Sequence, residues 1–148
     1  MLEADDGHIV TIASIAGKLA THGHPDYYAS KHAAVGLHDA TTMDILESGK
    51  SGVRTTLVCP YYIHTPMFDT RGAQTRFPFL MPTLTADYVC ERIVEAVQLD
   101  VDFLVLPNVF YAFVLNLPFL PYKAQHLIGK YLGLVQSQDR FNRQSNKN

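Results

Sequence analysis

The sequence lacks the features that mark several large classes of protein. Its 148 residues carry a formal net charge of −2 at pH 7, and no basic run stands out along the chain. A nucleic-acid partner is therefore excluded, because binding to phosphates needs a positively charged patch or stripe. The chain has no internal repeats, and its one low-complexity stretch is the polar tail QSQDRFNRQSNKN at residues 136–148.

Cysteine is also scarce. Cys59 and Cys90 are the two in the chain, and their separation matches neither a CxxC motif nor a zinc-binding spacing. A reduced, intracellular setting is favoured over a disulfide between them. The first residues, MLEADDGH, have neither the basic start nor the apolar stretch of a secretory signal peptide, and they are typical of an internal part of a larger fold.

The sequence does contain enough apolar residues for one packed domain, since 47% of its residues are hydrophobic and 18% are charged. Short apolar runs alternate with longer stretches of helical periodicity. The runs at 8–14, 53–59 and 102–106 predict buried strands, and helices are expected over 27–46 and 86–98. This alternation indicates an α/β fold with a parallel sheet.

Each predicted helix should bury one face. The positions expected to face inward are Ala33, Leu37, Ala40 and Ile45 in the first helix and Val89, Ile93 and Val97 in the second. Thr85 is the predicted N-cap of the second helix. Residues 60–82 contain four prolines and predict a long loop, and long loops are disproportionately functional.

Residues 107–121, PNVFYAFVLNLPFLP, are very apolar but are interrupted by prolines. A membrane-spanning helix needs about 20 apolar residues, and this stretch reaches that length only by running through Pro107. We expect instead an apolar helix that lies on the body of the protein or in a membrane interface. Residues 122–135, YKAQHLIGKYLGLV, continue it with an amphipathic pattern.

A tyrosine and a lysine stand one helical turn apart in the stretch HPDYYASKHAAVGL. Tyr27 and Lys31 therefore share one helix face. Oxidation of an alcohol to a carbonyl releases a proton along with the hydride, and a phenolate can accept that proton. An ammonium about 4 Å away favours the phenolate by up to about 4 kcal/mol at an effective dielectric constant of about 20. Ser14, at the end of the first strand, can hold the substrate oxygen against the phenol.

The tyrosine–lysine pair alone is a weak signal, because many helices contain such a pair by chance. Two further stretches strengthen it, namely IASIAG around Ser14 and VCPYYIHTPMF after the second strand. A metal site was considered for the histidines His22, His24, His32 and His38. No carboxylate or thiolate lies at ligand spacing from them, so no metal is predicted.

Taken in order, IVTIASIAG, YYASKHAAVGLHDA and GVRTTLVCPYYIHTPMF resemble the second half of a short-chain dehydrogenase/reductase, from about Gly7 to about Val135. The closest resemblance is to the branch of the retinol dehydrogenases and the microsomal and lipid-droplet 17-beta-hydroxysteroid dehydrogenases. It implies the C-terminal half of a Rossmann-type, doubly wound parallel sheet with an apolar helical extension. The implied division is a partial dinucleotide-binding domain at 1–106, the extension at 107–135 and the tail at 136–148.

The resemblance implies roles for individual residues. Tyr27 would accept the proton in alcohol oxidation, Lys31 would stabilise the phenolate and bond the nicotinamide ribose, and Ser14 would orient the substrate oxygen. The implied cofactor contacts are Tyr27, Lys31, Pro60, Ile63 and Thr65, with the backbone of Ile63 at the nicotinamide carboxamide. The candidates for the substrate wall, besides Ser14, are Tyr61, Met67 and Phe68. Residues 66–82 would form a flexible lid, although simple loop packing explains the three wall candidates equally well.

The implied reaction interconverts a lipophilic alcohol, such as retinol or a steroid, and its carbonyl, with NAD or NADP as cofactor and a slight preference for NAD. The implied location is the cytosolic face of the endoplasmic reticulum membrane or the surface of a lipid droplet, with the cytoplasm as the alternative. The full-length form is expected to be a homodimer.

The glycine-rich turn with which this family receives the pyrophosphate is not found among the nine glycines. We therefore expect the chain to be roughly the second half of the fold. Such a piece should bind a dinucleotide poorly and seek a partner for its exposed sheet edge. The alternative hypothesis is a catalytically silent, truncated form that associates with a membrane or lipid droplet, or pairs with a full-length homologue.

Overall fold

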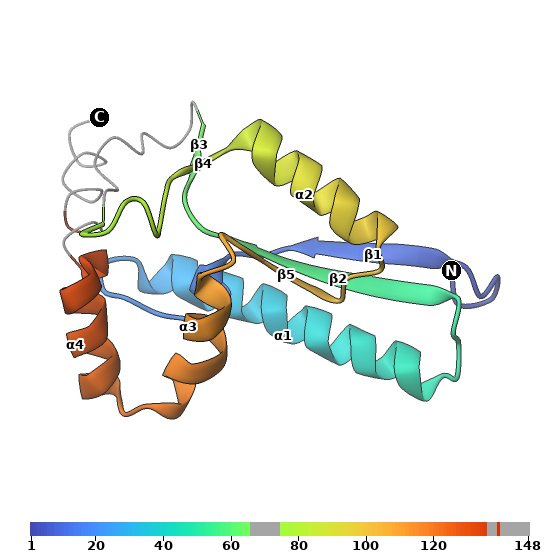
Figure 1. Cartoon of the computed structure of the whole chain (residues 1–148). Coiled ribbons are helices and arrows are strands. Elements are labelled where there is room, and N and C mark those ends of the chain that lie inside the picture. Colours follow the sequence, from blue (N-terminus) through green and yellow to red (C-terminus); the bar gives the residue numbers. More distant parts are fainter. Residues whose placement is uncertain (66–74, 136–138, 140–148) are drawn as a thin grey trace.

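Three parallel strands form the centre of the structure (Figure 1). The computed structural model describes residues 1–65, 75–135 and 139. The strands of the central sheet, in spatial order, are β1 (Gly7–Ile12), β2 (Val53–Pro60) and β5 (Phe103–Leu106). Both neighbouring pairs are parallel, and a helix lies in each connection between them. The predicted parallel α/β fold is confirmed, because parallel neighbours require such crossovers.

Helices α1 (Pro25–Glu47) and α2 (Ala86–Gln98) cover opposite faces of the sheet (Figure 1). The Oγ1 of Thr85 accepts a hydrogen bond from the backbone N–H of Tyr88 at 3.4 Å, which confirms the predicted N-cap of α2.

A second, two-stranded parallel sheet joins β3 (Ile63–His64) to β4 (Leu84–Thr85). The prediction of a loop throughout residues 60–82 was wrong for Pro60, which ends β2, and for the two residues of β3. Strands as short as β3 leave no periodic pattern in a sequence, so they escape detection by periodicity.

The alternating side chains of the strands divide the core into two layers. Leu57 and Cys59 of β2 pack in the layer that includes Val35 of α1, whereas Val58 packs in the layer that includes Val89 of α2. All three β2 side chains are buried, as expected for a central strand that is covered on both faces.

The face that α1 turns to the sheet differs from the predicted one. Its buried residues are Val35, His38 and Ile45. Of the four positions predicted to face inward, Ile45 is buried, whereas Ala33, Leu37 and Ala40 are exposed. The prediction failed because apolar residues occur on every side of this helix, so hydrophobic periodicity does not select one face.

The C-terminal region forms a helical hairpin beyond the end of β5 (Figure 1). It consists of α3 (Phe110–Asn116), the 3₁₀ turn η3 (Leu117–Phe119) and α4 (Tyr122–Leu132). A single apolar helix was predicted for 107–121, whereas the structure has the shorter α3 followed by η3. The hairpin contributes Phe110, Val114 and Leu132 to the layer of the core that includes Val35 of α1. Within the described ranges, no helix combines the length and apolar character needed to cross a membrane.

Gly133 ends α4 in the left-handed conformation, with φ of 80°, where the chain before β4 approaches closely. A Cβ atom at this position would lie 2.6 Å from the backbone nitrogen of Arg76. The guanidinium of Arg76 in turn lies 5.1 Å from the ring centroid of Tyr131. The described part of the predicted lid, residues 75–82, therefore packs against α4, and its Met81 is only 2% exposed.

Candidate active site

Ser14 lies just beyond the carboxyl end of β1 and connects it to the end of β2. Its Oγ accepts a hydrogen bond from the N–H of Ala16 at 3.1 Å, which begins the 3₁₀ turn η1 (Ile15–Gly17). The same hydroxyl donates to the carbonyl of Pro60 at 3.3 Å. In open α/β sheets, ligands bind outside the carboxyl ends of the strands, and Ser14 lies at that edge.

Gly17 holds the turn that follows Ser14 against the first half of α1. A Cβ atom on Gly17 would lie 2.6 Å from the carbonyl oxygen of Lys31 and 2.7 Å from Cγ2 of Val35. Real Cβ contacts are longer, so only glycine allows the two segments to come this close. This contact brings the Ser14 turn to the part of α1 that carries Lys31.

Tyr27 and Lys31 lie together in the first turns of α1. The Nζ of Lys31 is 5.8 Å from the centroid of the Tyr27 ring, within the range of a cation–π contact. Tyr27 is 40% exposed, so a small molecule can reach it. The two predicted side chains therefore lie together, on the part of α1 whose backbone packs against the turn that begins at Ser14.

Two further tyrosines lie close to Tyr27. The rings of Tyr27 and Tyr28 meet edge to face, with centroids 6.2 Å apart. Burial raises the pKa of Tyr28 and that of Tyr62. The neighbouring phenols of Tyr28 and Tyr27 raise the pKa of Tyr62 further. Burial thus favours the neutral form of both phenols. Of the three tyrosines, Tyr27 is the one that combines exposure with a lysine over its ring.

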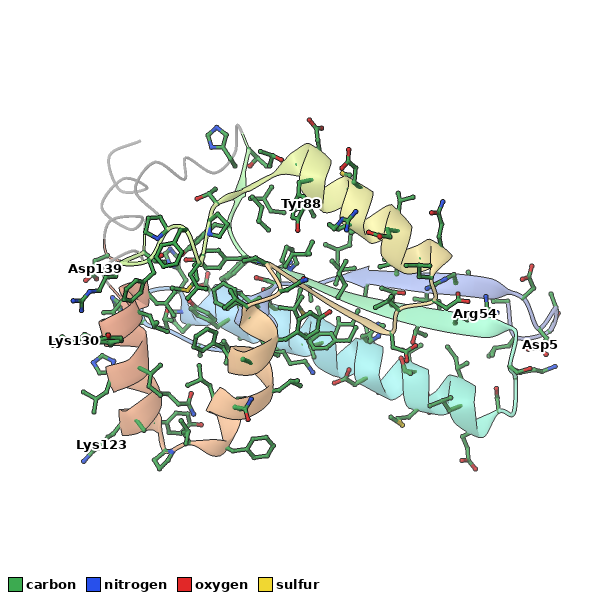
Figure 2. All side chains as sticks on the ribbon, viewed as in Figure 1. Asp5, Arg54, Tyr88, Lys123, Lys130 and Asp139 are labelled. Carbon is green, nitrogen blue, oxygen red and sulfur yellow. The ribbon has the colours of Figure 1, made fainter. Side chains whose placement is uncertain are left out.

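One local and one long-range contact fix the loop between η1 and α1. Oγ1 of Thr21 and the hydroxyl of Tyr28 share a hydrogen bond of 2.6 Å. Nε2 of His22 lies 2.6 Å from Oδ1 of Asp139, which Figure 2 labels near the end of α4. The loop that leads into Tyr27 is thus tied both to α1 and to the C-terminal region.

The histidines form no metal cluster in the part of the chain that the structure describes, where no group of three potential ligands was found. Nδ1 of His32 lies 2.9 Å from the carbonyl oxygen of Tyr28. Nδ1 of His38 lies 2.9 Å from Oγ1 of Thr11 on β1. Burial lowers the pKa of the His38 imidazole, which is therefore favoured in its neutral form between α1 and the sheet.

The residues predicted to contact cofactor or substrate follow the end of β2. Pro60 receives the Ser14 hydroxyl, Ile63 lies in β3 and pairs with β4, and Thr65 follows β3 directly. Tyr61 is buried, and its ring stacks on that of Phe110 with centroids 4.7 Å apart. This position suits core packing, the alternative considered for Tyr61. The other two candidates for the substrate wall, Met67 and Phe68, lie outside the described residues.

Both cysteines are free, so the alternative of a disulfide between them is excluded. Cys59 is buried in β2, and burial raises the pKa of its thiol to about 11. Cys90 is exposed on α2. The two thiols should therefore differ strongly in reactivity, because the thiolate is the reactive form.

Sequence reasoning missed Gly17, Thr21 and Tyr28. Gly17 lies in the SIAG stretch, but its role depends on the distance to α1, which the sequence does not encode locally. The doubled tyrosine at 27 and 28 is visible, yet only the fold shows that the second hydroxyl meets Thr21.

Comparison with known proteins adds to this geometry. The family description "short chain dehydrogenase" matches residues 1–76, about half of the chain. The chain therefore belongs to the short-chain dehydrogenase family.

Two curated relatives are retinol dehydrogenases, the branch that the sequence motifs resemble. Epidermal retinol dehydrogenase 2 of Homo sapiens is 38% identical over 147 residues, which are 99% of this chain and 47% of the relative. Retinol dehydrogenase 10 of Rattus norvegicus is 38% identical over 136 residues, which are 90% of this chain and 39% of the relative. The chain thus spans about half the length, or less, of these relatives.

Two solved structures support the Rossmann-type fold. A short-chain dehydrogenase/reductase of Burkholderia phymatum in complex with NAD superimposes with a TM-score of 0.59 and 24% identity, covering 77% of this chain and 48% of that chain. A short-chain dehydrogenase of Burkholderia cenocepacia in complex with NADP gives a TM-score of 0.64 and 20% identity, covering 85% and 48% respectively. At these identities the likeness concerns the fold alone.

Proposed function

We propose that this chain carries the proton-transfer half of an NAD(P)-dependent dehydrogenase that interconverts a lipophilic alcohol and its carbonyl. The observation that carries the proposal is the position of Lys31 over the ring of Tyr27, beside the turn that begins at Ser14. Family membership, and the names of the two retinol dehydrogenases, support the reaction class and a retinol-like or steroid-like substrate.

Three side chains perform the proton transfer. In the oxidative direction the phenolate of Tyr27 accepts the proton of the substrate hydroxyl, and in the reductive direction the phenol returns it. The ammonium of Lys31 stabilises the phenolate by charge attraction. Ser14 exchanges its hydrogen bond to Pro60 for one to the substrate oxygen, which holds that oxygen in reach of Tyr27.

The residues present fit the nicotinamide end of NAD or NADP. The ammonium of Lys31 can bond the ribose, and the segment from Pro60 to Thr65 runs along the carboxyl edge of the sheet, where Ile63 and Thr65 would contact the ring and its carboxamide. The cofactor supplies the acceptor or donor of the hydride. The solved relatives with NAD and with NADP support either dinucleotide.

We further propose a location and an oligomeric state. A substrate of this kind partitions into lipid, which supports a site of action at the endoplasmic reticulum membrane or a lipid-droplet surface. The outer side of α1 exposes Leu37, Met43 and Leu46, each by more than 60%, which supports pairing of two subunits through this helix.

The test compares two tyrosines of equal exposure in the intact protein. Tyr27 and Tyr88 are each 40% exposed, and both lie near the start of a helix. Tyr27→Phe should reduce turnover of all-trans-retinol with NAD by about 100-fold or more, because general acid–base catalysis contributes about that factor. Tyr88→Phe should leave turnover unchanged.

The outcomes separate the two hypotheses. Equal turnover by the wild type and Tyr27→Phe would remove the proposed role of Tyr27. Absence of turnover by a folded wild type, with retinol and with steroid alcohols and with either dinucleotide, would favour the catalytically silent form.

A further inference from the structure

The exposed face of α4 has an unusual composition. Its exposed residues are Tyr122, Lys123, His126, Leu127, Lys130 and Tyr131. Each of them is apolar, aromatic or basic. Leu127 and Tyr131 are 65% and 61% exposed, so large apolar side chains stand in water between basic ones. Helices that lie in the interface of a lipid layer combine these two kinds of residue on neighbouring strips.

The turn between α3 and α4 is more exposed still. Phe119 and Tyr122 are each 87% exposed, and Leu115 at the end of α3 is 56% exposed. The hairpin projects away from the sheet (Figure 1). Within its turn Leu117 is buried, so Phe119 and Tyr122 mark the side of the turn that faces solvent. Exposed apolar residues scattered singly are ordinary, whereas several on one short turn mark an interaction surface.

These residues are not needed to close the core. The inner side of the hairpin already supplies Phe110, Val114 and Leu132 to the core layer beneath α1. The outer side contributes nothing to that layer, so folding of the described residues does not explain its apolar character. Neither helix of the hairpin is long enough to cross a membrane.

Charge identifies the kind of partner. Residues 107–135 contain two lysines and no aspartate or glutamate, whereas the whole chain carries a net charge of −2. Lys123 and Lys130 are labelled in Figure 2 on the side of α4 that points away from the sheet. A second copy of this surface would bring lysines against lysines, which disfavours self-association. A layer of anionic lipid head groups complements it, because each lysine near such a surface gains attraction.

We propose that the outer face of the α3–α4 hairpin, which we call the hairpin face, binds the interface of an anionic lipid layer. The hairpin face consists of Leu115, Phe119, Tyr122, Lys123, Leu127 and Lys130; Tyr131 beside it already packs against Arg76 and Phe77. Its aromatic and leucine side chains enter the boundary between head groups and acyl chains. The two lysines extend their ammonium groups to the lipid phosphates. This inference specifies the membrane association proposed above, but it requires no catalytic role for Tyr27.

The test is flotation of the full chain with lipid vesicles, because aggregated protein sinks while vesicles rise. The wild type should float with vesicles of phosphatidylcholine and phosphatidylserine, and less with phosphatidylcholine alone. Lys123→Gln/Lys130→Gln should weaken partitioning onto the anionic vesicles about 25-fold, at about fivefold per lysine, and should not change binding to the neutral ones. Phe119→Ser/Leu127→Ser should weaken partitioning onto both about tenfold or more.

The matched control replaces exposed apolar residues with serine on another surface of the protein. Val94 and Leu99 are 56% and 67% exposed on and just after α2, so Val94→Ser/Leu99→Ser removes comparable exposed apolar area. This control should float like the wild type. Equal loss of flotation in control and hairpin variants, or no flotation of wild type that remains soluble, would overturn the proposal. A hairpin variant that instead abolishes a dimer in size-exclusion chromatography, with flotation unchanged, would assign the surface to self-association. Turnover is not measured, so failure here leaves the proposed reaction intact.

Discussion

The region around Ser14 and the C-terminal hairpin are stabilised in different proportions by polar and apolar contacts. Around Ser14, hydrogen bonds fix the backbone, namely the bond from Ser14 to Pro60 and the bond between Thr21 and Tyr28. In the hairpin, the bond from the Tyr111 hydroxyl to the carbonyl of Phe103 is joined by ring contacts such as Phe110 on Tyr61. Hydrogen bonds have narrow geometry, whereas apolar burial is non-directional. The region around Ser14 can therefore position reacting groups, and the hairpin can present a broad apolar surface for binding.

The comparison is sharpest between the two sides of the hairpin. Phe110 is 1% exposed in the core, and Phe119 is 87% exposed at the turn. Phe110→Ala should lower the free energy of unfolding by about 3–5 kcal/mol, because it removes a buried ring and leaves a cavity. Phe119→Ala should change it by less than about 0.5 kcal/mol. Urea unfolding followed by far-UV circular dichroism measures both. Similar values for the two variants would contradict the assigned inner and outer sides.

A smaller effect is expected where η1 meets α1. Gly17→Ala places a Cβ atom against Lys31 and Val35, and it should destabilise the fold by about 1–3 kcal/mol. The control is Gly36→Ala, since no atom lies within 4 Å of that added Cβ. Gly36→Ala should stabilise α1 by about 0.5–1 kcal/mol, because alanine favours helix over glycine. Stabilisation by Gly17→Ala as well would show that the Ser14 turn does not pack as closely as described.

Acid should weaken the contact between α1 and the sheet. Burial lowers the pKa of His38 below its ordinary value of about 6.5, outweighing the opposite effect of Asp39, while Lys18 acts in the same direction as burial. The relevant pH window lies between the lowered pKa of His38 in the native protein and its ordinary pKa in the unfolded chain. In this window the unfolded chain binds more protons than the native one, so stability falls as the pH falls through it. His38→Gln should reduce this slope in unfolding experiments between pH 7 and pH 5. An unchanged slope would remove His38 as its source.

The smallest effect concerns the thiols and leaves stability unchanged. The native protein should react rapidly with a disulfide reagent at one thiol per chain, Cys90, because Cys59 is buried and its pKa is raised to about 11. Cys90→Ser should abolish the rapid phase, and unfolding in urea should expose Cys59. A rapid phase that persists in Cys90→Ser would contradict the burial of β2.

Much of the fold could be predicted, because buried parallel strands are continuous apolar runs and Thr85 is a typical N-cap. The inward face of α1 could not be predicted, because apolar periodicity does not select it. Polar partners on the sheet select it instead, as Thr11 does for His38. The residues of the candidate site were recognisable from three ordered motifs. The contacts that hold them, through Gly17 and between Thr21 and Tyr28, depend on tertiary distances that no local pattern records.

The central claim is that the hydroxyls of Ser14 and Tyr27 act on one substrate oxygen. The most direct measurement is kcat/KM of the intact protein for Ser14→Ala, Tyr27→Phe and the double variant. Groups that act as a unit give strongly non-additive losses. We expect kcat/KM to fall about 100-fold or more in each single variant. In the double variant kcat/KM should be only a few-fold lower than in the less active of the two single variants. Losses that multiply, to about 10,000-fold or more, would show that the two side chains act independently and would contradict the account.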